Sequence, residues 1–127
     1  MSGFEKYRDI ESAGDQALKV EILYFPGCPN HAPAVTRVRE VLVQEGADAA
    51  ISEVEIHDAD AAQNVGFLGS PTIRINGRDV EPGAGSVAAF GMSCRTYVSG
   101  GQRAGIPPQE WIRAAVQEAG RSEDARH

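Results

Sequence analysis

Apolar residues follow two different periods along the chain, and their order predicts an α/β protein. The nearly continuous apolar and aromatic run Leu18–Phe25 is typical of a strand that is buried on both faces of a sheet. Residues 30–45 repeat apolar positions at steps of three and four and are followed by Gly46, which predicts an amphipathic helix with a glycine cap. The alternation over residues 50–57 predicts a second strand.

The next segment predicts a short helix and a β-hairpin. Asp58-Ala59-Asp60 can cap a short helix over residues 61–65, and both aspartates are better explained as helix caps than as metal ligands. Residues 72–75 alternate as a strand and run into Asn-Gly at 76–77, the strongest two-residue signal for a hairpin. Residues 78–80 should therefore pair back antiparallel.

A last helix begins at Pro107-Pro108 and is expected to end at Gly120. The element order is then β, α, β, α, β, β, α. Its first half is a βαβ unit, which implies a parallel strand pair with a right-handed crossover. We expect an α/β fold with a small mixed sheet of about four strands and helices on both faces.

The chain is expected to form one domain over residues 18–120. Residues 1–17 show no sustained period and predict a flexible arm, and residues 121–127 predict a polar tail. Residues 81–107 form a glycine-rich connection that carries Cys94 and shows no evident structure. A connection this long inside a compact domain is often functional.

Composition and charge exclude several function classes. The 127 residues are 42% hydrophobic and 24% charged, which is ordinary for a globular domain. The net charge of −6, without a Lys/Arg-rich run, would repel a phosphate backbone, so we expect no nucleic-acid partner. No apolar stretch approaches the roughly 20 residues of a membrane span, and the N-terminus lacks an apolar export signal. We expect a cytoplasmic protein with no membrane partner.

Cys28 is the first candidate for chemistry. It follows Pro26-Gly27, where the first strand ends and a helix is expected to begin. The free N–H groups and the macrodipole at a helix start favour the thiolate, which is the form of cysteine that attacks disulfides and binds metals. The alternative is a small buried residue that closes the turn. Two cysteines, Cys28 and Cys94, are too few for a disulfide scaffold and favour a catalytic, redox or metal-binding role in a cytosolic protein.

Two motifs resemble the thioredoxin-like fold, and the resemblance covers roughly residues 19–119. In that fold a strand runs into a cysteine-containing turn at the first core helix, as Phe-Pro-Gly-Cys-Pro-Asn-His does at residues 25–31. A cis-proline then precedes an antiparallel strand pair, as Gly-Ser-Pro-Thr at residues 69–72 would. The resemblance implies a cis Ser70–Pro71 bond and backbone hydrogen bonds from Ser70 to a bound thiol or peptide. An ordinary trans proline is the alternative.

Three segments also resemble a small bacterial family whose members are labelled alkylmercury lyase or thioredoxin-family protein. They are Gly-Cys-Pro-Asn, Leu-Gly-Ser-Pro-Thr-Ile with the following Asn-Gly-Arg-Asp-Val-Glu-Pro, and Ser-Cys-Arg-Thr-Tyr. The first label would imply binding, and by extension cleavage, of an organomercurial.

His31 marks a departure from the dithiol pattern. It stands where a Cys-x-x-Cys oxidoreductase has its second, resolving cysteine. On a helix, Cys28 and His31 would share a face, so the imidazolium could favour the thiolate, or the pair could bind a soft metal. A solvated histidine without such a role is the alternative.

Cys94 is the other possible half of a site. If its segment folds back over the Cys28 turn, Cys94 could resolve a mixed disulfide or complete a two-thiolate clamp for Hg²⁺, Cu⁺ or Zn²⁺. Arg95 could favour the Cys94 thiolate or hold an anion. The alternative is that Cys94 is buried packing under a long loop. The residues expected to bind the substrate are Pro29, Ser70, Pro71, Thr72 and Arg95.

Three functions follow from these residues. The first is thiol-disulfide or thiol-adduct chemistry through Cys28, with Cys94 as a distal resolving thiol and His31 as a tuning group. The second is a protein that binds a soft metal or an organomercurial through Cys28 and Cys94. The third is a thioredoxin-like binding scaffold, as a monomer or homodimer, without cysteine chemistry.

Overall fold

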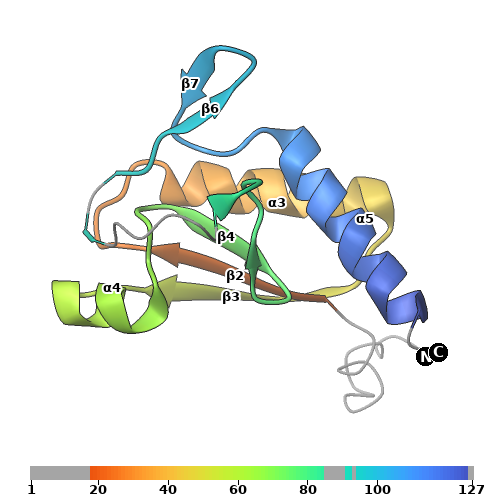
Figure 1. Ribbon diagram of the computed structural model, residues 1–127, viewed down its shortest axis with the longest axis horizontal. Helices are drawn as coiled ribbons and strands as arrows, with labels where there is room; N and C mark the ends of the chain where they lie inside the picture. Colours follow the sequence, from red (N-terminus) through yellow and green to blue (C-terminus); the bar gives the residue numbers. More distant parts are fainter. Residues whose placement is uncertain (1–17, 85–90, 93, 126–127) are drawn as a thin grey trace.

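A four-stranded mixed sheet forms the centre of the molecule (Figure 1). The computed structural model describes residues 18–84, 91–92 and 94–125. Strand β2 (Leu18–Tyr24) pairs in parallel with β3 (Ala49–Glu55) and antiparallel with β4 (Thr72–Ile75). Strand β5 (Arg78–Asp79) pairs antiparallel with β4, so the strand order is β3-β2-β4-β5.

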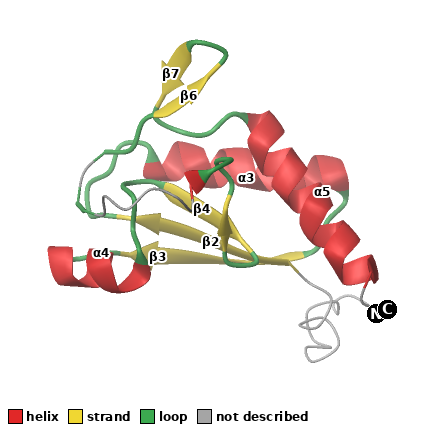
Figure 2. Cartoon of the chain, viewed as in Figure 1, coloured by secondary structure: helices red, strands yellow, loops and turns green. Residues whose placement is uncertain are grey.

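Helices cover both faces of this sheet (Figure 2). Helices α3 (His31–Glu45) and α5 (Gln109–Ala125) pack on one face, and the short helix α4 (Ala59–Val65) lies on the other. The arrangement is a small thioredoxin-like α/β fold, as expected. Within the described part of the chain, no helix is long and apolar enough to cross a lipid bilayer.

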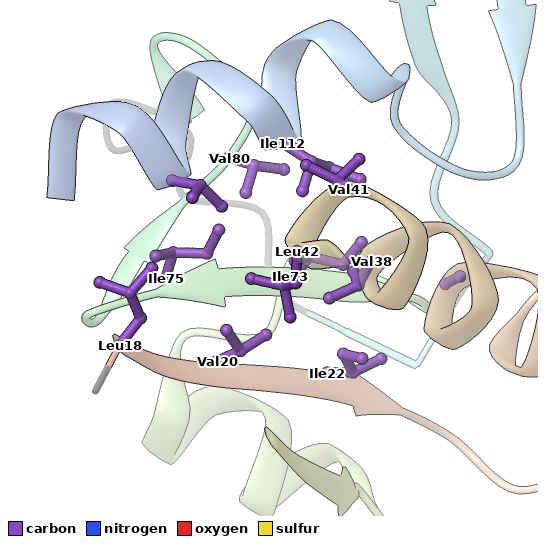
Figure 3. Close-up of a cluster of buried hydrophobic side chains, with 12 residues drawn as sticks. Leu18, Val20, Ile22, Val38, Val41, Leu42, Ile73, Ile75, Val80 and Ile112 are labelled. Carbon is purple, nitrogen blue, oxygen red and sulfur yellow. The ribbon is translucent and has the colours of Figure 1, made fainter. Parts of the chain in front are cut away.

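The larger hydrophobic core lies between the sheet and the α3–α5 layer (Figure 3). Strand alternation points Val20 and Ile22 toward α3, whereas Leu23 points to the α4 face, where it packs with Phe67. Each fully buried aliphatic side chain contributes about 1.5–3 kcal/mol of transfer free energy. The buried residues of the larger cluster are Leu18, Val20, Ile22, Ala34, Val38, Val41, Leu42, Ile73, Ile75, Val80, Ile112 and Val116.

Three local sequence signals, a glycine cap, an aspartate cap and a two-residue turn, act as we expected. Gly46 ends α3 in the left-handed conformation, at φ 62°. The Asp58 side chain caps α4 by accepting a hydrogen bond from the Ala61 N–H. Asn76 and Gly77 both have positive φ, as a two-residue hairpin turn between β4 and β5 requires.

The C-terminal third differs from the expectation in two places. The glycine-rich connection contains a second hairpin, β6 (Tyr97–Ser99) and β7 (Gln102–Ala104), which projects beyond the helices. Helix α5 continues through Gly120 to Ala125, so the predicted end at Gly120 and the tail from residue 121 are wrong. A single glycine costs a helix only about 1 kcal/mol and does not by itself end it. The predicted arm, residues 1–17, lies outside the described residues.

Candidate functional site

Cys28 lies between two consecutive turns. Its N–H donates to the Phe25 carbonyl at 3.3 Å, closing a turn whose central residues are Pro26 and Gly27. Gly27 has φ 83°, which the third position of a type II turn requires. The Cys28 carbonyl then accepts from the His31 N–H at 3.3 Å. Cys28 is half-buried in this turn.

Helix α3 begins after Cys28. The N-cap of α3 is Asn30, and the first helical residue is His31. Cys28 and His31 therefore do not share a helix face, because Cys28 is not part of the helix. Pro29, expected to contact the substrate, is exposed in the same turn.

The His31 ring is directed to the edge of the sheet. It stacks on Tyr24 with 3.6 Å between ring centroids and an interplanar angle of 8°. Its Nε2 lies 2.7 Å from a Glu53 carboxylate oxygen. Partial desolvation, followed by the negative charges of Glu55 and Glu53, raises the pKa of Tyr24. Within the described residues no hydrogen bond joins the His31 ring to Cys28, so these contacts favour a role in fixing the turn over the expected tuning of the thiol.

The cis-proline loop touches the Cys28 turn directly. The Ser70–Pro71 bond is cis, as the resemblance implied. Ser70, Pro71 and Thr72 are all buried, and the Thr72 hydroxyl donates to the Gly69 carbonyl at 2.6 Å. The Ser70 hydroxyl accepts from the Phe25 N–H at 3.3 Å. This bond joins the loop to the residue that begins the Cys28 turn.

Cys94 pairs with the same loop from the other side. Ser70 and Cys94 form an isolated parallel β-bridge, and the Arg95 N–H donates to the Ser70 carbonyl at 2.9 Å. Upstream, the Gly91 N–H bonds to the Phe67 carbonyl at 3.1 Å. We call residues 94–97, which run along the cis-proline loop, the strap.

The strap brings the second cysteine to the site. Ser70 forms the bridge with Cys94 and also accepts a hydrogen bond from the Phe25 N–H. The Phe25 carbonyl in turn accepts from the Cys28 N–H. Two residues, Ser70 and Phe25, therefore connect the backbone contacts of the two cysteines. Cys94 is exposed and both cysteines are free thiols. The alternative that Cys94 is buried packing is therefore wrong.

Arg95 anchors the strap. It has only 6% of its side chain exposed and forms ion pairs of 2.7 Å with Asp79 and with Glu81. A second nitrogen–oxygen contact of 2.9 Å makes the Asp79 pair bidentate, and Nη1 also donates to the Thr72 hydroxyl at 3.0 Å. Burial alone would lower the pKa of Arg95, but the hydrogen bonds and charge of Asp79 outweigh it and raise that pKa. Because its charge is neutralised inside the fold, Arg95 has a structural role in place of the expected anion-binding or thiol-tuning one.

Tyr97 holds the other end of the strap. Its hydroxyl donates to the Pro71 carbonyl at 2.6 Å, and the residue is only 1% exposed. The Arg95 guanidinium lies 4.6 Å from the ring centroid, in cation–π geometry. Burial raises the pKa of Tyr97, although the charge of Arg95 opposes the shift. No role was predicted for Tyr97 from the sequence. The Gly100-Gly101 pair, both residues at positive φ, is a hairpin signal that would have predicted a strand directly before it.

The segment after β7 covers the helix end of the Cys28 turn. Gly105 lies so close to Asn30 that a Cβ on Gly105 would come within 2.7 Å of the Asn30 Cγ. Only a residue without a side chain allows this approach. The Phe25 end of the turn is thus bonded to the cis-proline loop, and its Asn30 end lies against Gly105.

Potential metal ligands were compared across residues 18–84, 91–92 and 94–125. Among the residues that the structure describes, no group of three or more His, Cys, Asp or Glu side chains is placed to hold a metal ion. A two-thiolate clamp at Cys28 and Cys94 is the soft-metal arrangement that the site leaves open.

One family model matches this chain. The model is described as a domain of unknown function (DUF2703), and it matches residues 31–116. The matched segment begins directly after the Cys28 turn and includes the cis-proline loop and the strap. No curated protein and no solved structure matches the chain. Because the match spans more than half of the sequence, the protein belongs to the DUF2703 family.

Proposed function

We propose that the protein carries out thiol-disulfide or thiol-adduct exchange, with Cys28 as the attacking thiol and Cys94 as the resolving thiol. The observation that carries the proposal is the Ser70–Cys94 bridge, because it brings the second cysteine to the loop that is hydrogen-bonded to the Cys28 turn. The only partial burial of Cys28 and the exposure of Cys94 support access to both residues. Both steps require reduced thiols, which the proposed cytoplasmic location would maintain.

The reaction has two exchange steps. The Cys28 thiolate attacks one sulfur of a disulfide substrate, so that a Cys28 mixed disulfide forms and the other half leaves as a thiolate. The Cys94 thiolate then attacks the Cys28 sulfur, releases the second half of the substrate and closes a Cys28–Cys94 disulfide. The substrate disulfide gains two electrons and the protein dithiol loses them. A thiol or dithiol reductant must return the protein to its starting state.

The test traps the intermediate. Mixing reduced protein with a small disulfide should give a Cys28–Cys94 bond, seen by mass spectrometry as a link between tryptic peptides 20–37 and 79–95. Cys94→Ser should stop the reaction at the Cys28 mixed disulfide. Cys28→Ser should form no Cys28–Cys94 disulfide and should release no substrate thiol by this route. Turnover of the disulfide by Cys28→Ser at the wild-type rate would refute the proposal.

Soft-metal binding is the second candidate, because Ser70 contacts both the segment that carries Cys94 and the turn that carries Cys28, and both thiols are free. The reduced protein would then take up one Hg²⁺, or one organomercurial, per chain and lose that affinity in either single Cys→Ser variant. Uptake that remains unchanged in both variants would exclude a two-thiolate clamp. If the protein neither exchanges disulfides nor binds the metal, the remaining candidate is a binding scaffold without cysteine chemistry.

A further inference from the structure

The backbone of the cis-proline loop is already paired at Ser70, which forms a parallel β-bridge with Cys94. Ser70 is completely buried, its carbonyl accepts from the Arg95 N–H, and its hydroxyl accepts from the Phe25 N–H. The next carbonyl along the loop, that of Pro71, accepts from the Tyr97 hydroxyl. The expectation that Ser70 offers backbone hydrogen bonds to a bound thiol or peptide is therefore opposed at its carbonyl, which already accepts from the strap of the same chain.

The strap is difficult to displace. Moving it away from Ser70 would expose or separate the buried Arg95 from Asp79 and Glu81, and would take the Tyr97 hydroxyl from Pro71. A buried charge that loses its partners is strongly destabilising. An incoming peptide could not replace these contacts with backbone hydrogen bonds alone.

The sulfurs, in contrast, remain accessible. Cys94 is exposed on the strap, and Cys28 is half-buried in a turn whose neighbours Pro26, Gly27 and Pro29 are exposed. A small compound that reacts at a sulfur atom does not need to form backbone hydrogen bonds with the cis-proline loop, so the strap does not compete with it.

We infer that this site acts on small thiol or disulfide compounds and discriminates against extended polypeptides, because the strap occupies the peptide-pairing edge of the cis-proline loop. The inference rests on the proposed thiol function and gives it a substrate class.

The experiment compares two mixed disulfides that differ only in the residues around the reacting cysteine. One joins mercaptoethanol to N-acetyl-cysteinamide, and the other joins mercaptoethanol to a neutral, extended peptide with a central cysteine. Both are offered to the Cys94→Ser protein, in which Cys28 is the one remaining cysteine. The rate of Cys28 attack on the substrate cysteine is followed by mass spectrometry and divided by the rate with free dithiothreitol, which corrects for intrinsic reactivity.

We expect Cys28 to form the mixed disulfide with the small cysteine compound at least about tenfold faster than with the peptide, because the peptide lacks the pairing edge that would compensate for its bulk. Arg95→Lys keeps the positive charge but loses the bidentate fork. This variant should loosen the strap and bring the ratio of the two rates closer to one. Tyr97→Phe, which removes only the hydroxyl bond to Pro71, provides a second, milder variant.

The possible failures can be distinguished. Equal corrected rates for the two compounds in the Cys94→Ser protein, with Arg95 and Tyr97 unchanged, would overturn the substrate class and leave the thiol function standing. The same holds if the peptide reacts faster. If neither compound forms a mixed disulfide at Cys28, the proposed function and this inference fail together.

Discussion

At the scale of single residues, the contacts of Arg95 determine how the second cysteine is held. Its guanidinium connects Asp79 on β5, Glu81 beyond that strand and Thr72 of the cis-proline loop, while its backbone N–H bonds to Ser70. One side chain therefore joins the hairpin edge of the sheet to the strap. The position of Cys94 depends on this cluster, because Cys94 is the residue directly before Arg95.

Replacing Arg95 should destabilise the fold strongly. Arg95→Met leaves the Asp79 and Glu81 carboxylates without their buried cation, and we expect a loss of about 3–5 kcal/mol in the free energy of unfolding. The matched control is Arg113→Met, which removes a more exposed pair with Glu45 and should cost less than about 1 kcal/mol. Urea unfolding measures both. Similar losses in the two variants would contradict a structural role for the Arg95 cluster.

Tyr97 should make stability depend on alkaline pH. Burial raises the pKa of Tyr97 above its ordinary value of 10.0, so the folded protein keeps the phenol proton where the unfolded chain has lost it. Because the folded state then binds more protons, the free energy of unfolding should fall as the pH rises above about 10.

The variant Tyr97→Phe isolates this effect. It should lose about 1 kcal/mol at neutral pH, since Pro71 loses its hydrogen-bond donor, but it should show a shallower decline above pH 10. Urea unfolding of both proteins across this pH range gives the comparison. Parallel declines would mean that Tyr97 does not carry the dependence.

At the scale of elements, helices and strands with local signals were predicted, and the segment held by distant contacts was not. The periods of β2 and α3, the Asp58 cap and the Asn76-Gly77 turn are encoded within a few residues of where they act. The strap depends on residues far along the chain, such as Asp79 and Pro71, which no local pattern reveals.

The candidate site divides in the same way. Cys28 and the cis-proline were found from their motifs, and the resemblance correctly implied the cis bond. The meeting of Cys94 with Ser70 remained open, because it depends on how a glycine-rich connection folds back. The expected shared helix face of Cys28 and His31 was wrong, since α3 begins at His31 and the partners of its ring, Tyr24 and Glu53, come from two neighbouring strands.

The contact between Gly105 and Asn30 tests how the segment after β7 positions α3. Gly105→Ala would place a methyl group against the Asn30 side chain and should cost about 1–3 kcal/mol. Asn30 makes no side-chain capping bond, so Asn30→Ala should cost little alone and should relieve much of the loss when combined with Gly105→Ala.

A control for the added methyl group is available in α5. A Cβ on Gly120 meets no atom within 4 Å, so Gly120→Ala should stabilise the helix by up to about 1 kcal/mol. Thermal unfolding of the four variants distinguishes these outcomes. Additive effects of Asn30→Ala and Gly105→Ala would show that the two residues do not press on each other.

At the scale of the whole molecule, the central sheet positions segments that are distant in sequence. Strand β2 lies between β3 and β4, so the turn that follows β2 and the loop that precedes β4 meet at one end of the sheet. The strap, which follows the β4–β5 hairpin in the sequence, adds a third segment to that end through its bridge with Ser70. The two cysteines therefore come from different parts of the chain, Cys28 from the turn after β2 and Cys94 from the segment after β5.

Because Cys94 lies far from Cys28 in the sequence, a disulfide between them should raise the stability of the whole molecule. A bond between Cys28 and Cys94 would enclose α3, β3, α4, β4 and β5 in one covalent ring, which restricts the unfolded chain by about 4 kcal/mol in the loop-entropy model. Calorimetry of the oxidised and reduced forms should then show a clearly higher melting temperature for the oxidised protein, and no difference in Cys94→Ser. A bond between neighbouring cysteines would enclose almost nothing, so in this architecture the melting temperature itself would serve as a gauge of the oxidation state.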